Sequence, residues 1–593
     1  MSRFNTTTAR AVARSPVMSE AVPSGVTHEG APGYARDAKS ELFLLAVAYM
    51  GSDNTFYETG KARDTRFADL VRQVATEDPA WIGGFISWLR NDANMRTGSV
   101  VAAAEAARAL LSAGKPGGRK IVASALQRAD EPGELLAYWQ SLYGRAVPKP
   151  VKRGIGDALF RLFTEYPLLK YDTGSHAYRF ADILALVHPG DRKGSSQAGR
   201  FQGDWQHDLF GYAIGRRYGR DEPPATLRMI AANRRLREEA GEDPSSLLDA
   251  GRLREAGMTW EDALSMAGSK VSKKDLWSAL IPVMGFMGQL RNLRNFDEAG
   301  VPDEVAAGVV ARLTDAEQVA KSRQFPFRFL SAYRAAPSLR WAYPLERALN
   351  LSLANVPALK GRTLVLVDRS LSMWEAKMSA HSEIVWADAA AIFGAAVALR
   401  AERADLVEFA SRPAPVKFGA SESLLKIIER FHRGNDQNGP VGTGTDIPRA
   451  VRDSLRPDCV RVVIVTDEQS EPGMLPSNIY GHFAFADAMP PTRIDDLIPQ
   501  SVPVYVWNIG GYKHGVLPSG HGSRHLFGGL TDSAFRMVSL LEMGSGNARW
   551  PWEEVAALVR AYESRPAATQ KVTAGRPAAA RGEAGGQPAG GAG

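Results

Sequence analysis

Hydroxyl and carboxylate side chains gather in three short segments of the last part of the chain. The first segment is an Asp-x-Ser-x-Ser turn that carries Asp368, Ser370 and Ser372. The second segment supplies Thr445 and the third supplies Asp467. Oxygen ligands without Cys or His suit Mg²⁺, with Mn²⁺ or Ca²⁺ as alternatives. The pattern predicts a divalent-cation site in which water or a partner's acid completes the octahedron.

The elements that must position these side chains are predicted to be alternating strands and helices. We expect strands over residues 363–368, 405–409, 460–467 and 503–509, and helices over 384–399, 424–431, 449–454 and 531–541. Strands that are apolar on both faces and alternate with helices predict a parallel, doubly wound sheet, in which ligands bind at the carboxyl ends of the strands. The three segments should therefore meet at one edge, although each alone could be a helix cap or a turn.

The preceding part of the chain, from about Ala38 to Ala354, has apolar residues at three- and four-residue spacing and almost no strand-like alternation. We expect helices over residues 41–50, 80–90, 99–112, 134–143, 152–163, 273–290 and 325–335. A single bundle core does not grow to this length, so the pattern favours stacked helix pairs.

Positive charge is concentrated in this helical part. Lys and Arg outnumber Asp and Glu by 47 to 40 over residues 1–350 and equal them at 25 to 25 over residues 351–593. Residues 101–200 alone hold 15 basic and 9 acidic side chains. A localised basic field favours a polyanionic partner such as nucleic acid, although a charge run is also typical of a solvated helix face.

A helix that begins at Pro150 lies at the centre of this basic region. On a helical wheel Lys149, Arg153 and Phe160 point away from the core and Lys152 lies at the flank. The buried stripe is expected to consist of Val151, Ile155, Ala158, Leu159 and Leu162. Basic side chains beside an exposed aromatic ring could bind a nucleic-acid backbone and an unstacked base.

Composition excludes several classes of protein and site. The single cysteine, Cys459, rules out an intramolecular disulfide framework and a multi-cysteine metal site, and it favours a cytoplasmic location. No apolar run is long enough to span a membrane. Phosphate-binding glycine motifs and paired catalytic residues are absent, so we expect no enzyme. The His-rich segment 513–525 is expected to be a mobile loop, and an adventitious metal site is the alternative.

The segment over about residues 360–560 resembles the von Willebrand factor A domain with its metal-ion-dependent adhesion site. The resemblance implies that Ser370, Ser372 and Thr445 provide hydroxyl ligands for Mg²⁺. It also implies that the carboxylates of Asp368 and Asp467 act directly or through water. The family usually has Gly before the second serine, where this chain has Leu371, with bulky Arg369 nearby; we therefore expect weak metal affinity.

The helical part resembles the TROVE module of the Ro family of RNA-binding proteins, which is a ring of HEAT-like helical repeats. The similar motifs lie at residues 33–39, 51–57, 94–97, 149–155, 178–188 and 290–295. The resemblance implies a domain order of disordered arm, TROVE ring, A domain and disordered tail, over residues 1–32, 33–355, 356–563 and 564–593.

The Ro resemblance also implies RNA-contacting residues. Lys149, Lys152 and Arg153 match a basic motif that contacts Y RNA on the outer ring surface, and His188 falls where the family also has a histidine. Arg96 is a further candidate, but an ion pair with Asp92 at helical spacing would equally explain it.

The resulting hypothesis is a monomeric or RNA-assembled protein that holds a Y-like small non-coding RNA on its outer basic face. Its central hole would admit the single-stranded 3′ ends of misfolded RNAs, in RNA quality control or a stress response. An exoribonuclease such as polynucleotide phosphorylase is an expected partner, and no membrane is. The alternatives are a metal-dependent protein-binding scaffold without RNA function and a metal-dependent nuclease, for which the sequence offers no general base.

Overall fold

The computed structural model describes residues 14–49, 51, 54–190, 201–354, 356–379, 382–434, 437–472, 492–531, 538, 541–542 and 549–553. The predicted tail over residues 564–593 and the first part of the predicted arm, residues 1–13, lie outside the described residues. Among the residues described, no helix combines the length and the apolar character needed to cross a membrane.

The chain divides into two compact units, Met1–Ala548 and Arg549–Gly593. In the second unit, the rings of Trp550 and Trp552 stack with their centroids 5.4 Å apart. The first unit contains the helices and the sheet that the sequence predicts.

The amino-terminal part of the first unit consists of short helices joined by turns. The first series is α1 (Ala38–Val47), α2 (Gly60–Glu77), α3 (Pro79–Asn91), α4 (Arg96–Ser112), α5 (Gly118–Ala125), α6 (Glu131–Tyr143), α7 (Lys149–Leu162), α8 (Glu165–Tyr171), α9 (Phe180–Val187) and α10 (Asp204–Arg216). The second series is α11 (Arg228–Glu242), α12 (Ala250–Glu255), α13 (Trp260–Ala267), α14 (Lys273–Leu280), α15 (Phe286–Arg291), α16 (Leu293–Glu298), α17 (Asp303–Thr314), α18 (Ala316–Ser322), α19 (Pro326–Ala335) and α20 (Leu339–Leu351).

The helix that the sequence predicts over residues 273–290 is divided in the structure. Helix α14 ends at Leu280, a 3₁₀ turn follows over Ile281–Val283, and α15 begins at Phe286. Pro282 lies within the turn, and a proline has no N–H to continue the helical ladder. The prediction of one continuous helix was therefore wrong.

In the described residues of the carboxyl-terminal part, a six-stranded sheet has the strand order β5-β4-β3-β6-β7-β9. Its strands are β3 (Leu359–Asp368), β4 (Ala401–Phe409), β5 (Pro413–Pro415), β6 (Cys459–Thr466), β7 (Val504–Asn508) and β9 (Arg524–Gly528). Neighbouring strands are parallel except β4 and β5, which are antiparallel.

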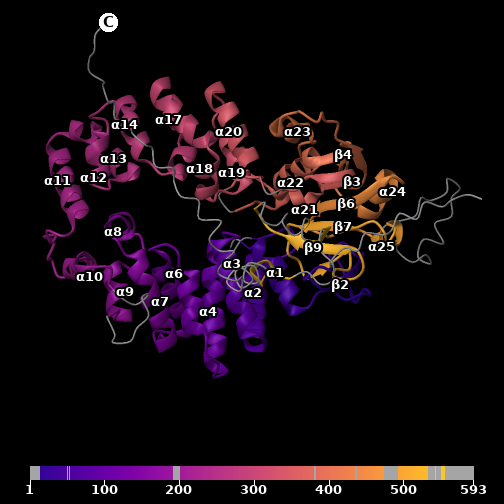
Figure 1. Ribbon diagram of the computed structural model, residues 1–593, viewed down its shortest axis with the longest axis horizontal. Helices are drawn as coiled ribbons and strands as arrows, with labels where there is room; N and C mark the ends of the chain where they lie inside the picture. Colours follow the sequence, from indigo (N-terminus) through magenta and orange to yellow (C-terminus); the bar gives the residue numbers. More distant parts are fainter. Residues whose placement is uncertain are drawn as a thin grey trace, which may run out of the picture. The chain divides into compact units, whose positions relative to one another are not determined.

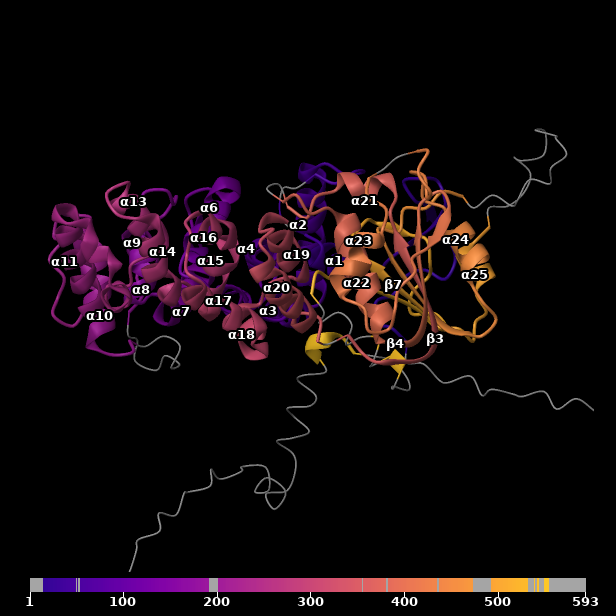
Figure 2. The same cartoon turned by 90° about the horizontal axis from the view of Figure 1, so that it is seen from above.

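The helices of this part are α21 (Leu371–Glu375), α22 (Trp386–Arg400), α23 (Leu424–Arg430), α24 (Ile447–Ser454) and α25 (Ile494–Leu497). Helices α22 and α24 contact β3 and β4 from opposite sides of the sheet, as Figures 1 and 2 show. This confirms the predicted doubly wound α/β architecture. The helix expected over residues 531–541 lies mostly outside the described residues.

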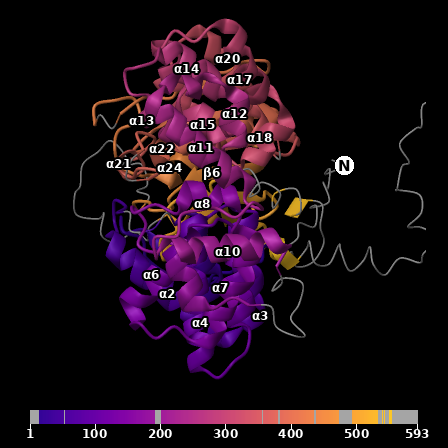
Figure 3. The same cartoon turned by 90° about the vertical axis from the view of Figure 1, so that its left-hand side faces the viewer.

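The helices form two rows that both return to the sheet. In Figure 1, α1 to α9 form one row and α12 to α20 the other, with α10 and α11 at the end far from the sheet. Figure 3 shows the two rows from that end, one above the other. Helix α1 contacts β9, while α19 contacts α22 and α20 contacts α23. Helices and sheet thus form a closed circuit, as expected for a helical-repeat ring completed by an A-like domain.

The segment before α1 is ordered against the sheet from residue 14 onward. A small antiparallel sheet pairs β1 (Gly25–Val26) with β2 (Pro32–Ala35), and β2 with β8 (His514–Gly515). Val17 is buried, and its carbonyl accepts a hydrogen bond from the Ser519 hydroxyl at 2.7 Å. The prediction of a disordered arm was wrong for residues 14–32, because their partners lie almost 500 residues away in the chain.

The His-rich segment 513–525 is therefore not a free loop. His514 pairs in β8, and His525 lies fully buried in β9, stacked on Tyr505 with ring centroids 5.2 Å apart. Burial lowers the pKa of His525 to about 4, so the ring stays neutral at physiological pH. The expectation of a mobile loop was wrong.

Helices α5 and α7 approach each other closely at one glycine. A Cβ atom added to Gly154 would lie 2.6 Å from the carbonyl oxygen of Arg119 and 2.8 Å from Cβ of Val122. Only a residue without a side chain fits there, because both neighbours belong to the rigid body of α5. This contact fixes the orientation of α7 on α5, and with it the direction in which the opposite face of α7 points.

We expect Gly154→Ala to destabilise the protein by about 1–3 kcal/mol through overpacking. The matched control is Gly211→Ala in α10, where an added Cβ meets no atom within 4 Å. That variant should be stabilised by about 0.5–1 kcal/mol, since alanine is the better helix former. Thermal unfolding of both variants checks the prediction, and equal stability of the two would contradict the close packing of α5 on α7.

Candidate functional site

The two predicted acidic ligands lie at the ends of adjacent parallel strands. Asp368 is the last residue of β3 and Asp467 directly follows β6, which pairs with β3. Both residues are fully buried. One oxygen of Asp368 accepts from the backbone N–H of Ser370 at 2.9 Å, and the other accepts from the Thr466 hydroxyl at 2.5 Å.

The segments that carry the predicted hydroxyl ligands meet at the same edge of the sheet. Ser370 Oγ and Ser372 Oγ are 3.2 Å apart. The backbone N–H of Leu371 donates to the carbonyl of Thr443 at 2.9 Å, which joins the first segment to the second. Thr445 is joined to the third segment, because its carbonyl accepts from the Ser470 hydroxyl at 2.8 Å. The structure therefore brings together the three segments that carry the five predicted ligands.

The charge state of this cluster fits a cation. Burial raises the pKa of Asp368, and burial together with the nearby charge of Asp368 raises the pKa of Asp467 well above its usual range. Among the described residues, Oδ2 of Asp467 is buried without a hydrogen-bond partner. Two buried like charges and an unsatisfied carboxylate oxygen are costly unless a positive charge compensates them. A hard divalent cation meets that requirement.

The ligand set combines acids and hydroxyls. In the part of the chain that the structure describes, no group of three or more His, Cys, Asp or Glu side chains could hold a metal ion. With two carboxylates, a cation bound here would also need hydroxyl and water ligands.

The two unusual residues of the first segment have structural roles of their own. Arg369 is buried with its guanidinium 4.4 Å from the Trp374 ring and 5.4 Å from the Phe431 ring. It donates to the carbonyls of Ala387 at 2.5 Å and His432 at 2.7 Å. Burial lowers the pKa of Arg369 to about 10. This arginine is thus anchored to backbone carbonyls and aromatic rings outside the predicted ligand set.

Leu371, the second unusual residue, begins helix α21 and is half-buried. A helical backbone suits any L-residue, so this position does not require glycine.

The predicted basic residues of α7 lie on its outer face. Lys149 and Arg153 are exposed and Lys152 is partly exposed. None of the three makes an ion pair with a residue that the structure describes. Arg119 on neighbouring α5 differs, because Asp157 neutralises it through two hydrogen bonds of 2.6 and 2.7 Å. The predicted core stripe of α7 is confirmed: Val151, Ile155, Ala158, Leu159 and Leu162 are all buried.

Phe160 does not provide the exposed ring that the helical wheel predicts. Its side chain is 4% exposed and packs against Phe201 and Phe210, with ring centroids 5.2 and 5.9 Å away. Helix α10 and the residues before it cover this side of α7, which the periodicity of α7 alone does not show. The expected base-stacking aromatic was therefore wrong.

His188 lies beside α7. It caps α9 with a left-handed backbone, φ 50°, and its side chain is exposed. Its neighbours Val187 and Pro189 come within 3.3 and 4.0 Å of the Cβ position of Gly156 on α7. His188 is thus held next to the face that carries Lys152 and Arg153.

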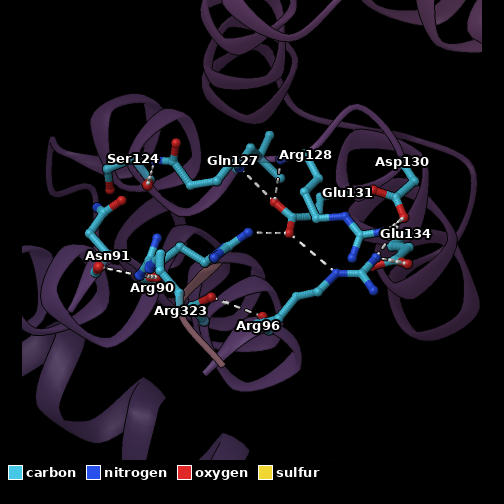
Figure 4. Close-up of polar contacts among 12 residues, drawn as sticks. Arg90, Asn91, Arg96, Ser124, Gln127, Arg128, Asp130, Glu131, Glu134 and Arg323 are labelled. Atoms are coloured by element: carbon cyan, nitrogen blue, oxygen red, sulfur yellow. Dashed lines mark hydrogen bonds and ion pairs between the residues drawn. The ribbon is translucent and has the colours of Figure 1, made fainter. Parts of the chain in front are cut away.

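Arg96 belongs to a partly buried ion-pair network (Figure 4). Glu131 is fully buried and accepts from Arg90 at 2.6 Å and from Arg96 at 3.2 Å. Arg96 also pairs with Asp130 and Glu134. Its charge is balanced by three acids of the α6 region, which favours the ion-pair alternative, and RNA binding by Arg96 stays a prediction. The alternative named from the sequence, an ion pair, is confirmed in kind, with Asp130, Glu131 and Glu134 as partners.

Further unpaired cations of the same region were not singled out from the sequence. Arg108, Lys120 and Arg145 are exposed and make no ion pair with a described residue. The guanidinium of Arg108 lies 5.4 Å from the centre of the Tyr143 ring. The local charge count over residues 101–200 was the signal that could have found them.

We expect Asp467→Asn to affect stability in opposite directions with and without Mg²⁺. In the metal-free protein the variant should melt at a higher temperature than the wild type, because it removes one of two buried like charges. In Mg²⁺ at roughly 100 times its dissociation constant, the wild type should gain about 2.7 kcal/mol and the variant nothing. Thermal melts in chelator and in Mg²⁺ measure both effects.

The control is Asp453→Asn on α24, an exposed acid paired only with Arg449 at 3.5 Å among described residues. It should respond to Mg²⁺ as the wild type does. An Asp467→Asn protein that Mg²⁺ still stabilises would remove Asp467 from the site.

Comparison with known proteins finds similarity to a known domain family within the helical part. The TROVE domain family matches residues 251–342. Telomerase protein component 1 of Mus musculus is 41% identical over 83 residues, and its counterpart in Rattus norvegicus is 42% identical over 77 residues. These alignments cover 14% and 13% of this chain but only 3% of either relative, so they concern one shared segment.

A solved structure matches over a much larger part. The crystal structure of the Deinococcus radiodurans RO (RSR) protein aligns with a TM-score of 0.54 at 17% sequence identity, covering 85% of this chain and 99% of that chain. At this identity the match shows a shared fold. The TROVE segment and the fold shared with a Ro protein together confirm the resemblance of this chain to the Ro family.

Proposed function

We propose that this chain is an RNA-binding protein that holds a structured, Y-like small non-coding RNA on the outer face of helix α7. The observation that carries the proposal is the set of unpaired cations there. Lys149, Lys152 and Arg153 point to solvent without a partner in the described residues, and exposed His188 lies beside them. Nearby Arg119 and Arg96, by contrast, are neutralised by acids.

Unpaired cations on a rigid helix suit a phosphate backbone. Phosphate contacts dominate affinity for nucleic acids and fix the position of the ligand, while base contacts add specificity. Arg108 on α4, Lys120 on α5 and Arg145 before α7 are further exposed cations without an ion pair among the described residues. A duplex or a folded small RNA fits such a surface better than a single base, because Phe160, the candidate stacking ring, is buried.

Single-stranded 3′ ends of misfolded RNAs are the second proposed ligand, taken up within the closed circuit of helices and sheet. This places the protein in RNA quality control or a stress response. An exoribonuclease such as polynucleotide phosphorylase is the proposed partner, in the cytoplasm, with the chain monomeric or assembled on RNA. The resemblance to the Ro family and the solved Ro fold support this part of the proposal.

For the A-like domain we propose that Mg²⁺ binds through Asp368, Ser370, Ser372, Thr445 and Asp467. When bound, the ion supplies a positive charge that offsets the two buried carboxylates. The five residues are each at most 2% exposed, which favours a structural site over one that acts on RNA or captures a partner's acid from solvent. The protein is accordingly proposed not to be an enzyme.

We expect the triple variant Lys149→Glu, Lys152→Glu, Arg153→Glu to lose at least about 100-fold in affinity for a structured small RNA, because three attractive charges become repulsive. The wild-type affinity should fall steeply with salt, and the variant should show a shallower slope. Melting temperature should change little, since these side chains lie off the core stripe. Filter binding or fluorescence anisotropy across a salt series measures both quantities.

The matched control reverses Lys270, Lys273 and Lys274, which are exposed on and before α14. It changes the net charge by the same amount at another place. If both triple variants lose affinity equally, RNA responds to overall charge and α7 is not the binding face.

Whether the protein cleaves RNA is tested by incubating the purified protein with labelled RNA in Mg²⁺. We expect the RNA to remain intact, since a buried cation without an adjacent general base cannot activate water against a bound phosphate. Cleavage by the wild type that is lost in Asp467→Ala would reverse this assignment.

A further inference from the structure

The loop that carries Asp467 is fastened by the amino-terminal segment. The Thr27 hydroxyl donates to the carbonyl of Ser470 at 2.8 Å. The side-chain oxygen of Gln469 accepts from the backbone N–H of His28 at 2.9 Å. These contacts join residues more than 440 positions apart in sequence, directly beside a predicted metal ligand.

Glu468, the next residue after Asp467, depends on the same segment. Its backbone is left-handed, φ 65°, a conformation that costs free energy for a residue other than glycine. Its buried carboxylate accepts from Arg36 and from Asn508, and the Arg36 side chain is buried with it. A buried carboxylate without a partner is costly, so Arg36 holds Glu468, and with it the Asp467 loop, in this conformation.

Tyr57, which precedes α2, closes over the cluster. Its ring stacks on His28 with centroids 4.8 Å apart and meets the edge of Tyr512 at 5.4 Å. Its hydroxyl donates to Glu29 of the same amino-terminal segment. The amino-terminal part of the chain thus packs beside Tyr512 and contacts the loop that follows the predicted acidic ligand Asp467.

The described ligands present almost no surface to a carboxylate of another protein, because all five are at most 2% exposed. Residues 27–36 of the same chain contact the loop Glu468–Ser470 directly after Asp467. In the von Willebrand-like arrangement expected from the sequence, a partner's acid would complete the shell. Here the chain's own amino-terminal segment lies against the loop that carries Asp467.

We propose that Thr27–Arg36 and Tyr57 form a cap that couples cation binding to docking of the amino-terminal segment, so that the metal site acts as an internal clamp between the helical part and the sheet. This inference rests on the proposed Mg²⁺ site and is independent of RNA binding. This coupling is reciprocal. If docking of the cap raises the affinity for the cation by a given factor, binding of the cation raises the equilibrium constant for docking of the cap by the same factor.

The test uses the full chain and the double variant Thr27→Val, Tyr57→Phe. Both changes remove one hydroxyl and keep the size and apolar contacts of the side chain, so the fold should be kept. The matched control, Thr226→Val with Tyr178→Phe, removes hydroxyls that bond to Asp208 at 2.6 Å and to Gln140 at 2.5 Å within the helical part. Calorimetry measures Mg²⁺ affinity, and amide hydrogen exchange follows residues 14–36 with and without Mg²⁺.

For the wild type and the control we expect Mg²⁺ to slow exchange in residues 14–36 by at least about fivefold. The cap variant should bind Mg²⁺ at least about fivefold more weakly, the lower end of typical coupling between sites. Equal Mg²⁺ affinity of cap variant and wild type, with exchange in residues 14–36 unchanged by the ion, would overturn the clamp and leave the metal site standing. A wild type that binds no Mg²⁺ at all would overturn both the metal site and the clamp.

Discussion

Two carboxylates buried side by side are the constraint on which the sheet half of this protein depends. Asp368 and Asp467 end adjacent strands and are withdrawn from water. Burial raises the pKa of Asp368, and burial together with the nearby charge of Asp368 raises the pKa of Asp467, so the arrangement is unfavourable as it stands. Hydrogen bonds to Asp368 and the nearby Arg369 offset part of this cost. The hydroxyls of the neighbouring segments are suited to a cation that would offset the rest.

The same constraint explains why the amino-terminal segment is ordered. A loop that must place Asp467 in a dry site, with Glu468 in a left-handed backbone, needs support from elsewhere. Residues 14–36 provide it through a small sheet with β8 and through the ion pair of Arg36 with Glu468. The helical part and the sheet are thereby tied at the site where a cation would bind.

In the helical part, cations that are paired with acids stabilise the fold, while unpaired cations are the proposed RNA contacts. Arg90 and Arg96 neutralise buried Glu131 and hold α3, α4 and α6 together. Lys149, Lys152 and Arg153 have no such task within the described residues, and the close packing at Gly154 keeps their helix in place. Cationic side chains without an ion-pair partner inside the protein are available to bind an external polyanion.

The spacing of apolar residues along the chain correctly predicted the features that depend only on nearby residues. The core stripe of α7, the strands that end in Asp368 and Asp467 and the convergence of the ligand segments follow from periodicity and from the geometry of parallel sheets. The features that local pattern did not show depend on distant neighbours. Phe160 is covered by Phe201 and Phe210, and Arg96 is paired with acids some 35 residues away. The order of residues 14–32 comes from contacts with the other end of the chain, which no local signal shows.

The most direct measurement is ultraviolet crosslinking of a bound structured small RNA to the purified protein, with the crosslinked peptides identified by mass spectrometry. The account predicts crosslinks in the peptides that contain residues 149–153 and His188, extending to Arg108, Lys120 or Arg145, and lost at high salt. Crosslinks confined to residues 356–548, or none at a saturating RNA concentration, would contradict RNA binding by the outer face of the helical part.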